Sequence, residues 1–292
     1  MPTISVVQTL EPYKQLIDKK IQNYIDQLGP KNRVRDACEY ALLNDGKRFR
    51  PALVMMIAKG LGHEVDVSQA ALAIEFFHTA SLIADDLPCM DDDSERRNQP
   101  TVHRVFGEST ALLATYALIS SGYACLANNA SQIKHHCSLS FAKEADLLCR
   151  LAIENISFNT GLFGAASGQL LDLAPPNLTL PMLKEIIHKK TVTLFEISFV
   201  LGWLFGGGNQ DLLPMVKKSA SHFGMAFQFA DDIDDMEQDL IHNHSLNIAN
   251  VCGKENAFLF FEEEIRFFKE TLVCLALQES ELANLLPFVV PA

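Results

Sequence analysis

Hydrophobic residues recur at steps of three and four along nearly the whole sequence, which is the pattern of amphipathic α-helices. The predicted helices cover Leu10–Leu28, Asn32–Leu43, Pro51–Leu61, Val67–Leu87, Ser109–Ala127, Phe141–Phe158, Gly161–Leu173, Pro181–Phe205, Leu212–Asp235 and Phe258–Leu272. The segment Pro181–Phe205 is expected to be either a helix pair or one bent helix. No stretch alternates strictly between apolar and polar residues, so no sheet is predicted, and no change of composition indicates a linker. We therefore predict one all-α domain over residues 1–292.

The segment Val67–Leu87 is the most apolar of the long helices, and a helix that is apolar on most faces is buried on all sides. Polar character returns abruptly at its end, where Asp85–Asp93 places five carboxylates within nine residues. Neighbouring like charges raise each other's pKa unless cations neutralise them. A second acidic cluster, Asp231–Asp235, follows another apolar segment about 140 residues later.

Oxygen ligands without accompanying His or Cys favour Mg²⁺, which proteins usually bind through one or two carboxylates together with substrate phosphates. On a helix, Asp231 and Asp232 share a face with Asp235, and Gln228 lies one turn earlier on that face. Solvated acidic loops are the alternative, but two clusters that each end a hydrophobic segment make that alternative weaker. In the first cluster Pro88 interrupts the helix, so Asp85 and Asp91 converge only if the loop turns back.

Composition and charge restrict the class of protein. With 48% hydrophobic and 21% charged residues the chain is globular, and a net charge of −12 argues against nucleic-acid binding. A diphosphate substrate would need metal ions to reverse the local sign of charge. Seven cysteines without a Cys-x-x-Cys pair favour reduced thiols in the cytoplasm. We expect no signal peptide and no membrane span, because Met1–Tyr13 lacks a basic start with an apolar core and no apolar run reaches about 18 residues.

A separate basic set indicates anion recognition. The turn Gly46–Pro51 carries Lys47, Arg48 and Arg50, and Arg96–Arg97 follows the first acidic cluster. Arginine forms bidentate hydrogen bonds with phosphate, although a solvated basic turn is an equal alternative for Gly46–Pro51 taken alone. His78 lies seven residues before Asp85 on the same side of the helix, where a histidine is more often a satisfied core residue. Gly206–Gly208 is interpreted as a helix–helix turn, because no strand precedes it and no Gly-Lys-Ser/Thr follows.

Together these motifs resemble the trans-isoprenyl diphosphate synthases (polyprenyl synthetases) of the farnesyl/geranylgeranyl diphosphate synthase type. The resemblance covers roughly Val34 to Asp239. The matching motifs, in order, are Gly46-Lys47-Arg48-Phe49-Arg50-Pro51, Asp85-Asp86-Leu87-Pro88-Cys89-Met90-Asp91, Arg96-Arg97, Pro100-Thr101-Val102-His103, Phe106-Gly107-Glu108, Gly168-Gln169-Leu170-Leu171-Asp172-Leu173, Lys190-Thr191 and Phe227-Gln228-Phe229-Ala230-Asp231-Asp232-Ile233-Asp234-Asp235.

The resemblance implies about ten helices around a central cavity, the isoprenoid synthase type I fold, in a homodimer. It implies about three Mg²⁺ ions, two held by Asp85 and Asp91 with the allylic diphosphate and a third by Asp231. Other residues of the same motifs would support these ions, namely Asp86, Asp232 and Asp235.

The resemblance also implies the substrates and the reaction. Four residues would bind isopentenyl diphosphate: Lys47, Arg50, His78 and Arg97. Arg96 and Lys190 would bind the allylic diphosphate, whether dimethylallyl, geranyl or farnesyl. With Mg²⁺ they would stabilise charge on the departing diphosphate, so that the allylic C–O bond ionises. Thr191 and Gln228 would face the carbocation, isopentenyl diphosphate would add to it, and the departed diphosphate would accept the proton.

Two departures from the family pattern affect this interpretation. Ala84 precedes the first motif where relatives often have His, and Leu240–Ile248 replaces the usual lysine-containing stretch, with His244 in place of the lysine. The alternative is therefore a weakly active or non-catalytic partner subunit that modulates another prenyl synthase. A terpene cyclase is less favoured, because the second motif is all aspartate.

Product length is expected to depend on the helix below Asp85. Ser81 lies one turn below and Phe77 two turns below, about 12 Å away at 1.5 Å per residue. Because Ala80 and Ser81 are small, the upper pocket should be open, with Phe77 as its floor. We expect a twenty-carbon rather than a fifteen-carbon product, and Phe77→Ala should lengthen it.

Overall fold

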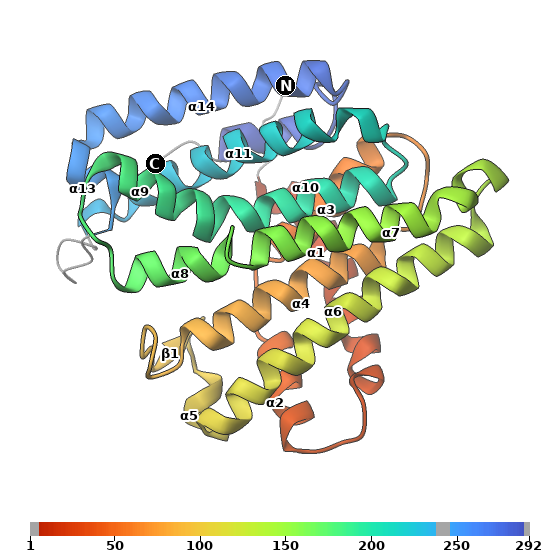
Figure 1. Ribbon diagram of the computed structural model, residues 1–292, viewed down its shortest axis with the longest axis horizontal. Helices are drawn as coiled ribbons and strands as arrows, with labels where there is room; N and C mark the ends of the chain where they lie inside the picture. Colours follow the sequence, from red (N-terminus) through yellow and green to blue (C-terminus); the bar gives the residue numbers. More distant parts are fainter. Residues whose placement is uncertain (1–5, 238–245, 289–292) are drawn as a thin grey trace. The chain divides into compact units, whose positions relative to one another are not determined.

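The structure, a computed structural model, describes residues 6–237 and 246–288 (Figure 1). Its chain divides into two compact units, unit 1 (Met1–Met55 and Glu64–Ile153) and unit 2 (Met56–His63 and Glu154–Ala292). Over the described residues all regular secondary structure is helical except for one short hairpin, which confirms the predicted all-α class. The prediction of a single domain stays a prediction.

Unit 1 contains the first acidic cluster and the basic turn. Its elements are α1 (Val6–Tyr24), η1 (Ile25–Leu28), α2 (Arg33–Leu42), the first part of α3 (Phe49–Gly60), α4 (Ser68–Asp85), β1 (Glu95–Arg96), β2 (Gln99–Pro100), α5 (Val102–Phe106), α6 (Glu108–His136) and the first part of α7 (Leu139–Thr160).

Helix α4 is the apolar helix that the sequence predicts, and 12 of its 18 residues are buried. It packs along α6 (Figure 1). Phe76 and Ile74 have no exposed surface, and neither does Leu118 on α6. This packing fixes the direction of α4 and thus the place of the carboxylates at its end.

The hairpin β1–β2 was not predicted. Glu95 pairs with Pro100 and Arg96 with Gln99, in antiparallel register. Arg97 and Asn98 at the turn have positive φ angles of 55° and 61°, as a two-residue type I′ turn requires. Strands of two residues are too short to leave an alternating pattern in the sequence.

Unit 2 contains the second acidic cluster. Its elements are the last parts of α3 and α7, α8 (Ala165–Leu173), α9 (Leu180–Ile187), the π-helix η2 (His188–Val192), α10 (Thr193–Phe205), η3 (Gln210–Leu212), α11 (Leu213–Asp234), α13 (Ile248–Cys252), α14 (Lys254–Cys274) and η4 (Ala283–Phe288). Helices α11 and α14 pack along each other. Helix α9 continues through η2 into α10 without a break. The predicted segment Pro181–Phe205 is therefore one continuous helical segment and not a pair of separate helices.

The triple glycine forms the turn that the sequence predicts. Gly206 N donates to Gly202 O and closes α10, and Gly208 N donates to Trp203 O at 2.8 Å. Gly207 has a φ of +87°, which side chains rarely adopt.

One described helix, α6, is long and apolar enough to cross a membrane by length and composition alone. In its most apolar window 39% of the residues are buried, and α6 packs on α4. A core helix of a soluble protein passes the same test, so this feature carries little weight.

Candidate active site

The loop after α4 turns back on itself, as convergence of Asp85 and Asp91 requires. Asp86 N donates to Leu82 O in the last turn of the helix, and Met90 N then donates to Leu87 O at 2.8 Å. Asp91 N donates to Asp85 O at 2.9 Å. The loop that contains Pro88 therefore brings the backbone of Asp91 against the end of α4.

Asp86 has a different environment from its neighbours. It is buried, and its Oδ1 accepts from Arg96 Nε at 2.5 Å, while Arg96 Nη2 donates to Asp93 Oδ2 at 2.9 Å. Burial raises the pKa of the Asp86 carboxyl, although the charge of Arg96 opposes the rise. The structure thus gives Asp86 the role of orienting Arg96. Its predicted support of a metal ion stays a prediction.

The three cations of the basic turn have different environments. Lys47 is exposed, whereas Arg48 is buried and donates to Glu75 Oε1 of α4 at 2.6 Å and to Asp18 Oδ1 of α1 at 2.8 Å. Arg48 Nη2 also donates to the carbonyls of Leu42 and Asn44. Burial lowers the pKa of the Arg48 guanidinium, but the nearby carboxylates of Glu75 and Asp18 outweigh the effect of burial, so the pKa is raised overall. Arg48 therefore holds the turn in place.

Arg50 and His78 come together at this turn, with Arg50 Nη1 3.1 Å from His78 Nε2. Burial and the positive charges of Arg50 and Arg97 hold the pKa of His78 well below its usual range. A neutral His78 accepts from Arg50 through Nε2. The three cations Lys47, Arg50 and Arg97, together with the neutral His78, are called the cation cluster below.

Arg97 reaches the cation cluster from the hairpin. Its Nη1 donates to Asn44 Oδ1 at 2.6 Å, and burial lowers the pKa of its guanidinium. A Cβ on Gly46 would lie 2.4 Å from Arg97 Nη1 and 2.8 Å from Arg48 Nη1. The glycine thus leaves room for both guanidinium groups, and Asn44 is a contact that the sequence analysis missed.

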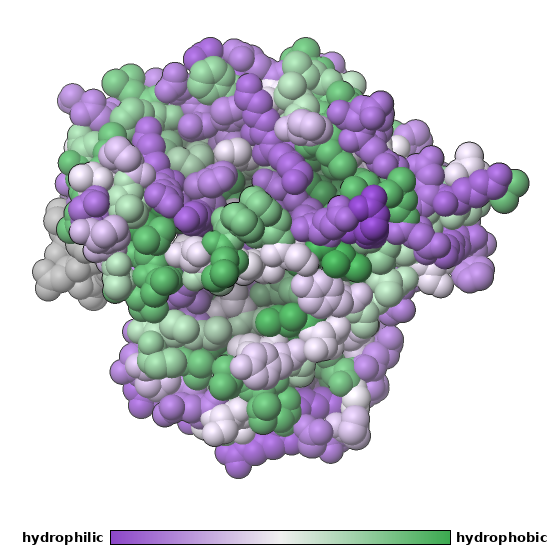
Figure 2. Space-filling view, in the orientation of Figure 1, coloured by the Kyte–Doolittle hydropathy of each residue, from purple (hydrophilic) through white to green (hydrophobic). Residues whose placement is uncertain are grey.

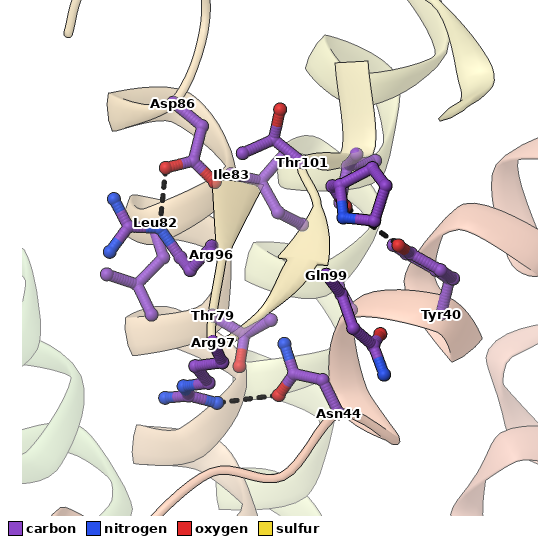
Figure 3. Close-up of a pocket in the computed structure, with 13 residues that line it drawn as sticks. Tyr40, Asn44, Thr79, Leu82, Ile83, Asp86, Arg96, Arg97, Gln99 and Thr101 are labelled. Carbon is purple, nitrogen blue, oxygen red and sulfur yellow. Dashed lines mark hydrogen bonds and ion pairs between the residues drawn. The ribbon is translucent and has the colours of Figure 1, made fainter. Parts of the chain in front are cut away.

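The two hairpin arginines line a small pocket together with residues of α4 and the end of α2 (Figure 3). Figure 3 shows Arg96 bonded to Asp86 on α4 and Arg97 bonded to Asn44 after α2, while Tyr40 Oη donates to the carbonyl of Pro100 at 2.7 Å. The hairpin is thereby fastened at three points. Arg96 and Arg97 therefore have different partners, Asp86 and Asn44, and can act as two separate cations.

In unit 2, the π-helix η2 presents Lys190 and Thr191. Single π turns are rare and often occur at functional sites. Lys190 Nζ forms a short ion pair with Asp172 of α8. A Cβ on Gly168 would lie 2.7 Å from Lys190 N, so the glycine allows α8 to lie this close to the π-helix.

A chain of hydrogen bonds connects η2 to α11 and α13. Thr191 Oγ1 donates to Gln228 Oε1 at 2.9 Å, and Gln228 Nε2 donates to Asp232 Oδ1 at 2.8 Å. Asp232 Oδ2 accepts from Ile248 N at 2.8 Å, and Asp232 O accepts from Asn247 Nδ2 at 2.6 Å. The buried Asp232 therefore orients Gln228 and the start of α13.

Asp231 and Asp235 are exposed at the end of α11, where Asp235 N donates to Asp231 O at 2.9 Å. Over residues 6–237 and 246–288, no three His, Cys, Asp or Glu side chains form a ready metal site by themselves. In unit 1 Asp85 is half-buried and Asp91 exposed, and in unit 2 Asp231 is exposed. Each of these carboxylates fits an Mg²⁺ ion that also binds substrate phosphates, because such an ion needs only one or two carboxylates. The predicted substitution His244 lies outside the described residues.

The three residues of the predicted product-length pocket lie on α4. Phe77 is 5% exposed, and its ring meets Tyr123 of α6 edge to face, with 5.1 Å between the ring centroids. Ala80 is buried, and Ser81 donates to His78 O at 2.8 Å. Phe77 is thus directed toward α6. Tyr123 is a neighbour that no sequence pattern indicated.

The sequence matches the polyprenyl synthetase family model over residues 31–243. A trans-prenyltransferase of African swine fever virus (isolate Warthog/Namibia/Wart80/1980) is 33% identical, over 82% of this chain and 70% of that protein. The farnesyl diphosphate synthase of Bacillus subtilis (strain 168) is also 33% identical, over 80% of this chain and 77% of the relative. A geranyltransferase structure from Helicobacter pylori 26695 matches with a TM-score of 0.80 at 27% identity, covering 99% of this chain and 98% of that one. These similarities confirm the predicted isoprenoid synthase fold.

Proposed function

The chain belongs to the polyprenyl synthetase family and is a short-chain trans-prenyltransferase, and we propose that it joins isopentenyl diphosphate to an allylic diphosphate. The allylic substrates would be dimethylallyl, geranyl or farnesyl diphosphate, and the product geranylgeranyl and/or farnesyl diphosphate. The observation that carries the proposal is the pairing at the end of α4, where a loop that returns Asp91 to Asp85 lies beside arginines fixed by Asp86 and Asn44.

The cation cluster is proposed to bind isopentenyl diphosphate. Lys47 is exposed, and the neutral His78 orients Arg50 without adding charge. Arg97 is fixed by Asn44 and therefore loses little freedom when a phosphate binds. Guanidinium groups bind phosphate oxygens through two parallel hydrogen bonds, which makes this set suited to a diphosphate.

Arg96 and Lys190 are proposed to bind the allylic diphosphate. Arg96 pairs with Asp86 and Lys190 pairs with Asp172. Each carboxylate thereby holds the side chain of its cationic partner in one orientation. Asp85, Asp91 and Asp231 would hold about three Mg²⁺ ions by resemblance, with Asp86, Asp232 and Asp235 in support. When bound, Mg²⁺ would neutralise charge on the departing diphosphate.

The carbocation is proposed to be faced by Thr191 and Gln228. Thr191 Oγ1 donates its proton to Gln228 Oε1, so the remaining lone pairs of both oxygens are available to a positive charge. Asp232 keeps Gln228 in this orientation through the amide nitrogen. The isopentenyl double bond would attack, and the proton would pass to an oxygen of the released diphosphate, so no side-chain nucleophile is needed.

The test is to incubate the purified protein with Mg²⁺, isopentenyl diphosphate and each allylic starter, and to size the dephosphorylated products. Asp91→Asn should reduce the turnover by about 100-fold, as expected for loss of one group that stabilises developing charge. Asp92→Asn is the matched control, because Asp92 is also exposed in the same loop, and it should leave the turnover near that of the wild type. Equal losses in both variants would contradict the assigned role of Asp91.

A second candidate function is a weakly active partner subunit that modulates another prenyl synthase. The observation in its favour is His244 where the family usually has a lysine. His244→Lys separates the two candidates. A rise of tenfold or more in turnover from a very low level supports the modulator, whereas a change below threefold supports the active synthase.

We also propose that the protein forms a homodimer in the cytoplasm. Helix α6 exposes a row of apolar side chains, namely Leu112, Leu113, Tyr116 and Ile119, which a second copy would cover. Figure 2 shows hydrophobic residues among hydrophilic ones on the surface of the protein. All seven cysteines are free thiols, which supports a reducing compartment. Light scattering should give twice the mass of one chain, and Leu113→Glu should give the mass of one. A single-chain mass for the wild type would contradict the dimer.

A further inference from the structure

Gly122 lies in the middle of α6, directly against the ring of Phe77 on α4. A Cβ at Gly122 would lie 2.8 Å from Phe77 Cζ and 2.9 Å from Cε2. Real Cβ atoms do not come this close to another carbon, so any side chain here would force the ring to move. Glycine is a poor helix former, and the contact with Phe77 gives a physical reason for it within a helix of 29 residues.

The Phe77 ring also contacts a second residue of α6. Tyr123, the residue after Gly122, meets the ring edge to face, and Phe77 is only 5% exposed. The ring is rigid, so it cannot yield by bending as a lysine or methionine would, and close packing leaves little room for small adjustments. A Cβ at Gly122 would therefore turn the whole ring away from α6.

We propose that Gly122 is a product-length determinant that acts through Phe77. Without a Cβ, it lets the Phe77 ring lie against α6 and so leaves room for the growing prenyl chain below Asp85. This inference rests on the proposed synthase function. Gly122 touches no reacting atom and acts only by positioning Phe77.

Two variants follow from this geometry. Gly122→Ala should displace the Phe77 ring from α6 toward the prenyl chain, so the main product should become one five-carbon unit shorter. Tyr123→Ala removes the second side chain that the ring contacts and adds no bulk. The Phe77 ring can then move further from the prenyl chain, so the product should become longer.

Interdependence of the two residues provides the sharpest test. In the Phe77→Ala background no ring remains to be displaced, so Gly122→Ala should not change product length there. Melting temperatures give a readout that does not depend on activity. Gly122→Ala should lower the melting temperature of the wild type but raise that of Phe77→Ala, because alanine favours helix once the clash is gone.

The experiment sizes the products of the wild type, Gly122→Ala, Tyr123→Ala, Phe77→Ala and Phe77→Ala/Gly122→Ala with one starter at saturating Mg²⁺. Ala124→Val, at an exposed position on the same helix, is the matched control and should match the wild type. Unchanged products in Gly122→Ala and Tyr123→Ala would overturn the inference, as would equal shortening by Gly122→Ala with and without Phe77. A wild type that forms no condensation product would instead overturn the proposed function and the inference with it.

Discussion

The buried ion pair between Arg48 and Glu75 gives the most direct stability prediction. Both side chains are 2% exposed, and Arg48 Nη1 lies 2.6 Å from Glu75 Oε1. Glu75→Gln keeps the shape but removes the negative charge, and breaking a buried pair in this way costs about 3–5 kcal/mol. Because Asp18 and two carbonyls continue to contact Arg48, we expect the lower end of this range.

A loss of about 3 kcal/mol should lower the melting temperature by about 6–12 °C, at about 2–4 °C per kcal/mol for a chain of this size class. Calorimetry or circular dichroism at pH 7 measures this shift. Asp146→Asn is the matched control, because its partner Lys134 is 43% exposed and Asp146 is 80% exposed. An exposed pair contributes about 0–1 kcal/mol, so the control should melt within about 4 °C of the wild type. Equal shifts in the two variants would refute the assignment of Arg48 as the buried anchor of the basic turn.

Two further predictions concern the cations. Because burial and the nearby arginines lower the folded-state pKa of His78, its contribution to stability is complete above the unfolded pKa of about 6.5 and is lost as pH falls below it. The melting temperature of the wild type should therefore fall more between pH 7 and 5.5 than that of His78→Asn, and parallel profiles would contradict this. Asp86→Asn should raise KM for the allylic substrate more than for isopentenyl diphosphate, because it releases Arg96 and leaves Arg97 with Asn44. Equal changes in the two KM values would argue against separate roles for the two arginines.

The helices were predictable because their hydrophobic periodicity is strong and their ends carry Pro, Gly or acidic residues. The apolar segment that became α4 is the clearest case, since a helix with almost no polar face must be buried. The β1–β2 hairpin was missed because each strand has two residues, and its type I′ turn uses Arg97 and Asn98 rather than the common Asn-Gly.

The pairings within the candidate site were not predictable from spacing. Lys47 and Arg48 are adjacent in the sequence, yet one is exposed and the other is buried with Glu75, which is 27 residues away from it. Asp86 and Asp85 are likewise adjacent, but only Asp86 is buried with Arg96. Such differences depend on which way a side chain leaves the end of a helix, and the neighbours that decide this come from distant segments.

Incorporation of labelled isopentenyl diphosphate by the purified chain alone, with and without Mg²⁺, measures the proposed prenyl transfer itself. We expect labelled products longer than the allylic starter, formed only with the metal and suppressed in Asp91→Asn but not in Asp92→Asn. A folded protein that forms no labelled product with any of the three starters would contradict it.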